Sequence, residues 1–237
     1  MWNNIYTREE QNNRFPIYER LVGSVENKTV MDFGGNTGNL LYFSEGKIKE
    51  ENYVCVDLEK EALAIGEAEY PNAEWISYDR YAWCYNHNGE RNSPFPSPKK
   101  EQIDHIFSYS VFSHTDFHEL VTTLKWMKTF NPEVIAVSVL LTENKVIANW
   151  FWQRRVQEYG NCVDYRNHLR DCQTTFSVFD NDFIVEDTPY MAEYNSRHLI
   201  TFYQSDWLIS ELAKEGFEVE LIQPPGSFQS FILLKKA

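Results

Sequence analysis

The chain has few cysteines and no long apolar run among its 237 residues. None of the cysteines forms the C-x-x-C pair that marks zinc sites and redox sites. No apolar stretch is long enough to cross a bilayer, and the start Met-Trp-Asn-Asn lacks the basic and apolar regions of a signal peptide. We therefore expect a cytoplasmic protein with reduced thiols and no membrane partner. The cysteines are Cys55, Cys84, Cys162 and Cys172.

Basic residues are also scarce, since 22 Lys and Arg stand against 35 Asp and Glu and give a net charge of −13. The negative electrostatic field of such a protein repels the phosphate backbones of nucleic acids, so we expect neither DNA nor bulk RNA as a partner. Aromatic residues are abundant instead, at 16% of the chain. That is more than a small core needs, and it predicts that some of them line or cap a pocket.

Short apolar segments alternate with amphipathic ones from residue 29 onward. This pattern predicts one α/β domain in which a parallel sheet is covered on both faces. The predicted strands are residues 30–33, 53–57, 73–77, 103–109 and 134–141, and the predicted helices are residues 38–47, 59–70 and 117–130.

The C-terminal end departs from this alternation. A helix is predicted over residues 204–215, followed by strands over 217–223 and 228–235. Only Pro-Pro-Gly-Ser separates these two strands, which is too short for a parallel crossover. The two strands must therefore be antiparallel neighbours.

Three further segments complete the expected domain of residues 1–237. The spacing of apolar residues in 1–28 predicts a helical segment on the domain edge. The alternating prolines of residues 80–102 predict a long loop. Residues 142–197 form a larger aromatic-rich insertion. Because both insertions follow predicted strands, we expect them at the carboxyl edge of the sheet, where α/β sheets bind ligands. We interpret residues 142–197 as a substrate cap.

A glycine-rich turn follows the first predicted strand. Residues 34–38 read Gly-Gly-Asn-Thr-Gly, with apolar residues before them and a helical pattern after them. A strand, a glycine turn and a helix together bring backbone N–H groups against a nucleotide-like ligand. Asp32 stands just before the turn, where a carboxylate would repel a pyrophosphate and attract an ammonium group. An NAD-type oxidoreductase is therefore disfavoured, by Asp32 and by the antiparallel C-terminal hairpin.

These features together resemble class I S-adenosylmethionine-dependent methyltransferases. The resemblance covers residues 29–141 and 202–236 and implies a Rossmann-like methyltransferase fold. Its sheet would be mostly parallel and seven-stranded, with a C-terminal antiparallel hairpin strand and an inserted cap. In that family the second strand ends in an acidic residue that binds the ribose hydroxyls. Asp57 stands at this position, about 20 residues after the turn.

The resemblance implies S-adenosyl-L-methionine as the cofactor. The family commonly has glycine at the position of Asn36, but asparagine tolerates a positive φ, so the turn can keep its shape. The fourth strand and the segment after it would approach the methionine end of the cofactor. The implied cofactor-binding residues are Asp32, Gly34, Gly35, Asn36, Gly38, Asp57, Leu58, Tyr78, Asp79, Ser108, Tyr109, Tyr6 and Arg14.

A methyl acceptor that must lose a proton needs a base, and histidine is the side chain best matched to neutral pH. His114 is the first candidate because it follows the fourth strand, although it can equally serve to position the loop there. His198 is the second candidate. His114 and His118 have the i, i+4 spacing of two metal ligands on one helix face. No third metal ligand stands at a spacing typical of metal sites, so we expect no metal.

Aromatic residues and one arginine of the cap suit a small organic acceptor. Some of these aromatic residues can equally pack the insertion onto the sheet. The candidate substrate-binding residues are Phe112, Trp150, Tyr190, Tyr194 and Arg197. The sequence thus predicts methyl transfer to an oxygen or nitrogen of a small molecule. A catalytically inactive binding module on the same fold, and a methyltransferase acting on a protein or an RNA-linked group, remain alternatives, and the oligomeric state is open.

Overall fold

The computed structural model describes residues 13–82, 86, 88–90, 92–115, 117–141, 182–184, 201–203, 205–225, 227 and 229–236. Its centre is a sheet in which five parallel strands lie in the order β3-β2-β1-β4-β5. These strands are β1 (Val30–Phe33), β2 (Tyr53–Asp57), β3 (Glu74–Ser77), β4 (His105–Ser108) and β5 (Val134–Leu141). Because all five are parallel, their carboxyl ends meet at one edge of the sheet.

Two C-terminal strands extend the sheet beyond β5. β9 (Ser230–Lys235) pairs antiparallel with β5, and β8 (Glu220–Ile222) pairs antiparallel with β9. The prediction that the last two strands are antiparallel neighbours is confirmed. Together with the five parallel strands they give the mostly parallel, seven-stranded arrangement that the sequence predicted.

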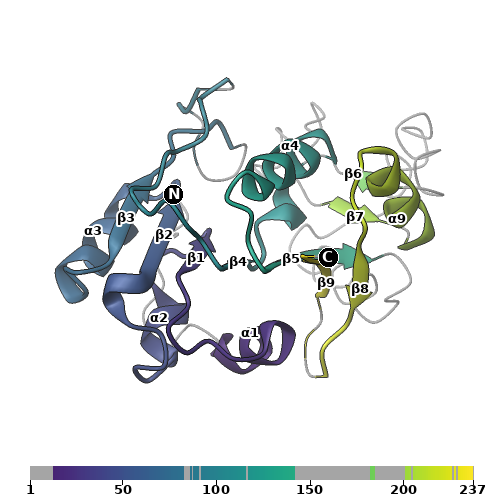
Figure 1. The fold of residues 1–237 in the computed structure, drawn as a ribbon. Helices are drawn as coiled ribbons and strands as arrows, with labels where there is room; N and C mark the ends of the chain where they lie inside the picture. The colour runs from purple at the N-terminus through teal and green to yellow at the C-terminus, as the bar shows by residue number, and fades with distance from the viewer. Residues whose placement is uncertain are drawn as a thin grey trace, which may run out of the picture.

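Helices cover both faces of the sheet (Figure 1). One face carries α1 (Phe15–Val22), α2 (Asn39–Phe43) and α3 (Lys60–Glu69), whose apolar side chains share a buried cluster with alternate residues of β1 and β2. The other face carries α4 (Phe117–Lys128) and α9 (Ser205–Lys214), which share a second cluster with the remaining strand residues. The continuous burial of β1 and β5 follows from this cover on both sides.

The strands predicted over residues 103–109 and 217–223 are shorter in the structure, at His105–Ser108 and Glu220–Ile222. Two further differences concern α2 and an additional strand. α2 ends at Phe43 rather than at residue 47, because Glu45 and Gly46 adopt left-handed φ values of 50° and 85°. A further strand, β7 (Thr201–Tyr203), was not predicted; it pairs in parallel with Leu140 and Leu141 at the end of β5, and antiparallel with β6 (Asp182–Ile184). The chain thus leaves and rejoins the sheet at the carboxyl end of β5. The predicted cap is described only at residues 182–184, so the rest of it stays a prediction.

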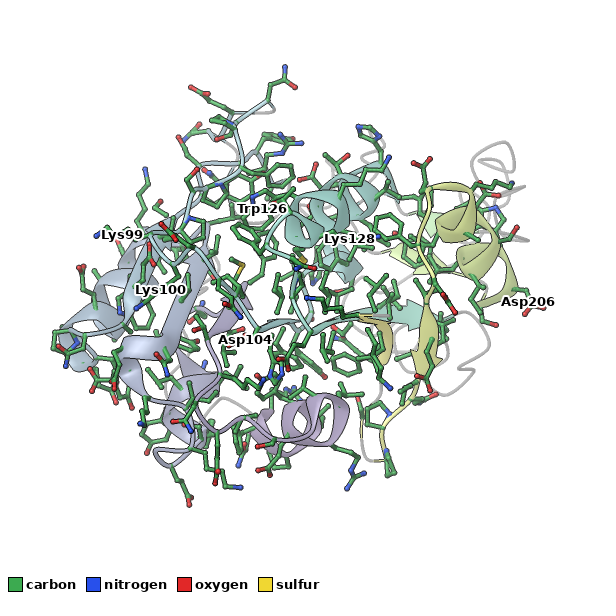
Figure 2. All side chains as sticks on the ribbon, viewed as in Figure 1. Lys99, Lys100, Asp104, Trp126, Lys128 and Asp206 are labelled. Atoms are coloured by element: carbon green, nitrogen blue, oxygen red, sulfur yellow. The ribbon has the colours of Figure 1, made fainter. Side chains whose placement is uncertain are left out.

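The predicted loop over residues 80–102 contains no named helix or strand among its described residues, and it is fixed to α4. Phe95 stacks on Trp126 of α4, with ring centroids 5.0 Å apart, and on Tyr78, at 5.7 Å. An ion pair between Arg80 and Glu119 adds a second attachment. Trp126 lies on the side of α4 that faces this loop (Figure 2).

Candidate functional site

The glycine turn, residues 34–38, lies at the carboxyl end of β1. Gly34 and Gly38 both have a φ of 81°, and Asn36 has a φ of 52°. Asparagine is one of the few side chains that adopt this conformation readily, so the expectation for Asn36 is confirmed. The turn is also tightly packed, because a Cβ atom at Gly35 would lie 2.7 Å from Cys55 Sγ. A residue with a side chain there would push the turn away from the sheet.

Asp57 joins the end of β2 to this turn. Its Oδ2 accepts a hydrogen bond from the backbone N–H of Asn36, at 2.7 Å, and its Oδ1 accepts one from the N–H of Glu59, at 2.8 Å. Burial raises the pKa of Asp57, and these backbone hydrogen bonds act against that rise. Each carboxylate oxygen retains acceptor capacity, so Asp57 can also accept hydrogen bonds from a ligand.

Asp32 is buried beneath the turn, with 5% of its surface exposed. Because side chains alternate along a strand, Asp32 lies on the same face as Tyr53 and Cys55 of the neighbouring strand. The Tyr53 hydroxyl donates to Asp32 Oδ2 at 2.7 Å. Burial raises the pKa of Asp32 to about 7, with a smaller contribution from the charge of Asp57, while the bond from Tyr53 acts in the opposite direction. A cation near Asp32 would favour its ionised form.

The segment after β4 contributes a second set of polar groups. Ser108 ends the strand with its side chain fully buried, and its Oγ makes no hydrogen bond with the described residues. A buried hydroxyl without a partner is costly, which is consistent with a ligand that completes its hydrogen bonding. The Arg14 guanidinium lies over the ring of Tyr109, 4.0 Å from its centroid, so the start of α1 reaches this edge of the sheet.

His114 lies close to the same edge. It ends the short helix η2 (Phe112–His114), its backbone N–H donates to the carbonyl of Val111, and its side chain is half-buried. Phe112 occupies a different place from the one expected of a substrate contact. It is 1% exposed and stacks on Phe33 in the core, with ring centroids 6.1 Å apart. Phe112 is therefore a core residue, not a surface against which a substrate can lie.

The remaining cofactor candidates lie beyond β2 and β3. The side chains of Leu58 and Tyr78 pack with the core cluster beneath α4. The backbone N–H of Tyr78 donates to the Asp57 carbonyl at 2.9 Å, and its carbonyl accepts from the Arg80 N–H at 2.8 Å. Asp79 is exposed, and its Oδ1 accepts a hydrogen bond from the Asn86 side chain at 2.9 Å. The candidates that lie outside the described residues are Tyr6, Trp150, Tyr190, Tyr194, Arg197 and His198.

The described residues contain no group of three or more His, Cys, Asp and Glu side chains arranged to hold a metal ion. They also contain no helix with the length and apolar character needed to cross a membrane.

Sequence reasoning missed several groups that shape the site. Tyr53, which donates to Asp32, reads as an ordinary strand residue. The buried Ser138 and Gln229 and the half-buried Ser110 form a polar cluster at the segment after β4. No sequence pattern marks these three residues, because 28 and 91 positions separate the partners in two of their contacts.

Comparison with models of known protein families and with curated proteins found no match. Solved structures, in contrast, share the architecture. An S-adenosylmethionine-dependent methyltransferase from Mesorhizobium loti aligns with 97% of this chain and 100% of its own, at a TM-score of 0.56 and 9% identity. The PH0226 protein from Pyrococcus horikoshii OT3 aligns with 95% of this chain and 89% of its own, at a TM-score of 0.51 and 13% identity.

DhpI, solved as a complex with S-adenosylhomocysteine, aligns with 92% of this chain and 81% of its own, at a TM-score of 0.51 and 10% identity. Identities this low establish the fold and not the activity. The chain therefore has the Rossmann-like fold of class I S-adenosylmethionine-dependent methyltransferases, as the sequence predicted.

Proposed function

We propose that the protein transfers a methyl group from S-adenosylmethionine to an oxygen or nitrogen of a small-molecule acceptor. The observation that carries this proposal is the convergence of the glycine turn, Asp32 and Asp57 at the carboxyl edge of a sheet with this fold. The same edge holds Ser108, whose buried hydroxyl has no partner among the described residues. The residues present thus fit a ligand that combines an ammonium group with a ribose.

In this proposal Asp57 binds the ribose hydroxyls while it keeps its hydrogen bond to the turn. Asp32 provides negative charge for the ammonium group, and Ser108 adds a hydrogen bond near the methionine end. Asp79 and the backbone at Tyr78 follow β3, where the adenine would lie. The other proposed contacts with the cofactor are Gly34, Gly35, Asn36, Gly38, Leu58, Tyr109, Arg14 and Tyr6.

The cofactor supplies an activated methyl group when it is bound, so the protein itself must orient the acceptor and exclude water. His114 is the proposed base, because it is half-buried and belongs to the segment that begins with Ser108. A neutral imidazole there accepts the proton that the acceptor oxygen or nitrogen loses. His198 is proposed as a second base or as an anchor for the acceptor.

The cap is proposed to select the acceptor. Support comes from the point where the chain leaves and rejoins the sheet, at the end of β5 and in β7, both at the carboxyl edge. Trp150, Tyr190 and Tyr194 would form an aromatic wall, and Arg197 would bind an anionic group of the acceptor.

Cofactor binding tests this function most directly. Isothermal titration calorimetry should show S-adenosylhomocysteine binding to the wild-type protein. Asp57→Ala should weaken the affinity at least about tenfold, because it removes a ribose contact and a support of the turn. The matched control is Glu67→Ala, which removes the same charge from an exposed position on α3. A wild-type protein that is folded and binds no S-adenosylhomocysteine contradicts the proposal.

A second measurement separates the alternative functions. Binding of S-adenosylhomocysteine without methyl transfer to any small molecule, protein or RNA from a panel of acceptors would favour an inactive binding module. Transfer to protein or RNA alone would favour the macromolecular alternative. Transfer to small molecules that His114→Gln slows at neutral pH, with partial recovery at higher pH, would support the proposed base.

A further inference from the structure

Ser110 adopts an unusual backbone conformation in the segment that follows β4. Its φ is 62°, in the left-handed region that residues other than glycine and asparagine seldom occupy. Such strain persists only where the surrounding structure holds it, and it is found most often near functional sites. Ser110 lies two residues after Ser108 and four residues before His114.

A closed set of hydrogen bonds holds Ser110 in this conformation. The Ser110 N–H donates to Ser138 Oγ at 2.7 Å, and the Ser138 hydroxyl donates to Gln229 Oε1. The side-chain amide of Gln229 then donates back to Ser110 Oγ at 3.0 Å. We call these three residues the Ser110 ring. It joins the end of β4 to the middle of β5 and to the residue that precedes β9.

Burial strengthens the ring. Ser138 is 0% exposed and Gln229 is 2% exposed, so water does not compete for their hydrogen bonds. In each link one donor meets one acceptor, and hydrogen bonds in such a chain polarise one another. Ser110 itself is half-buried, but the ring still fixes one conformation, because loss of Ser138 or Gln229 leaves the other buried side chain without one of its hydrogen-bond partners.

The ring connects to both parts of the candidate site. The Ser113 hydroxyl donates to the Ser110 carbonyl at 3.3 Å, which links the ring to the short helix that carries His114. On the other side, Val111 packs directly on the glycine turn, since a Cβ atom at Gly34 would lie 2.2 Å from Val111 Cγ2. The conformation of Ser110 therefore determines where Val111 meets the turn and where η2 begins.

We propose that Ser138 and Gln229 are positioning residues. Through the Ser110 ring they hold residues 110–114 so that Val111 supports the glycine turn and η2 presents His114 at the carboxyl edge. The part of this inference that concerns cofactor affinity rests on the proposed function. The part that concerns the conformation of residues 110–114 and of the turn does not.

Hydrogen–deuterium exchange tests the conformational part without any ligand. Gln229→Met keeps the length of the side chain and removes its amide, and Ser138→Ala removes the central hydroxyl. Each variant should exchange about tenfold faster in peptides that cover residues 108–114, and also faster at residues 34–38. The control is Ser44→Ala, which removes another buried serine hydroxyl, bonded to the Leu41 carbonyl, and should leave residues 108–114 unchanged.

A rescue experiment separates positioning from a general loss of stability. In calorimetry, Ser138→Ala should weaken S-adenosylhomocysteine binding about tenfold. Adding Ser110→Gly should recover most of the affinity, because glycine adopts the left-handed conformation without the ring. A protein that Ser138→Ala had merely destabilised would recover no affinity from Ser110→Gly.

The outcomes are distinguishable. Unchanged exchange at residues 108–114 in both ring variants overturns the inference, whether or not the cofactor binds. Faster exchange together with unchanged S-adenosylhomocysteine affinity overturns the role of the ring in cofactor binding. If the wild-type protein binds no S-adenosylhomocysteine, the proposed function fails, and exchange at residues 34–38 and 108–114 still decides whether the ring positions the turn.

Discussion

At the scale of single residues, Asp32 illustrates how burial sets the charge of a side chain. Its carboxyl lies beneath the glycine turn and accepts a hydrogen bond from Tyr53, and its pKa is raised to about 7, mainly by burial. In the unfolded chain the pKa of this carboxyl would be near its usual value of 3.8. Asp32 is therefore poised to change its charge near neutral pH, where a cationic ligand would favour the ionised form.

This raised pKa predicts how stability depends on pH. The folded protein binds the Asp32 proton more tightly than the unfolded chain does, so this group stabilises the fold most at acidic pH, and its contribution falls as pH rises from about 4 to about 7. The loss is about 4 kcal/mol at most, at ~1.4 kcal/mol per pKa unit. Urea denaturation of the ligand-free protein between pH 4.5 and 8 should show a weaker decline for Asp32→Asn than for wild type. Equal pH dependence in both proteins would contradict the raised pKa.

At the scale of secondary-structure elements, Trp75 sets how closely α2 and α3 approach β3. A Cβ atom at Gly66 would lie 2.2 Å from Trp75 Cη2, and one at Gly38 would lie 2.5 Å from the same atom. The indole N–H donates to the Tyr70 carbonyl at 3.1 Å, which fixes the ring in place. Gly66 therefore serves helix packing, although glycine in the middle of a helix is usually unfavourable.

Substitution of Gly66 tests this packing. Gly66→Ala should gain about 1 kcal/mol of helix propensity, but it inserts a methyl group where the indole lies. Overpacking of this kind costs about 1–3 kcal/mol, so we expect a net decrease in the free energy of unfolding, measured in urea. Glu67→Ala, one residue further along α3 and exposed, is the control and should change stability little. A Gly66→Ala protein more stable than wild type would show that the indole moves freely.

At the scale of the whole molecule, the net charge of −13 produces self-repulsion in the compact state. Salt screens this repulsion, since the Debye length falls from about 30 Å at 0.01 M to about 8 Å at 0.15 M. The thermal midpoint of the ligand-free protein should therefore rise when NaCl is raised from about 10 mM to about 150 mM. KCl at the same ionic strength should give an equal rise, and a midpoint that falls would contradict dominant self-repulsion.

Local signals in the sequence determined the order of the elements. The alternation of apolar and amphipathic segments predicted the five parallel strands, and the short connection before β9 required an antiparallel pair. Asn36 was identified as a residue that tolerates a left-handed turn, and Asp57 as the acid that ends β2. These predictions succeeded because periodicity and turn chemistry depend on residues close together in the chain.

Contacts between distant residues were decided only by the tertiary structure. Phe112 follows a strand at the functional edge, yet packing against Phe33 places it in the core. Ser110 gives no signal of its left-handed conformation, because the groups that hold it lie on β5 and just before β9. The sequence by itself therefore determined the fold and the position of the glycine turn. Strand register and burial, which bring remote side chains together, decided the pKa of Asp32 and the support behind the turn.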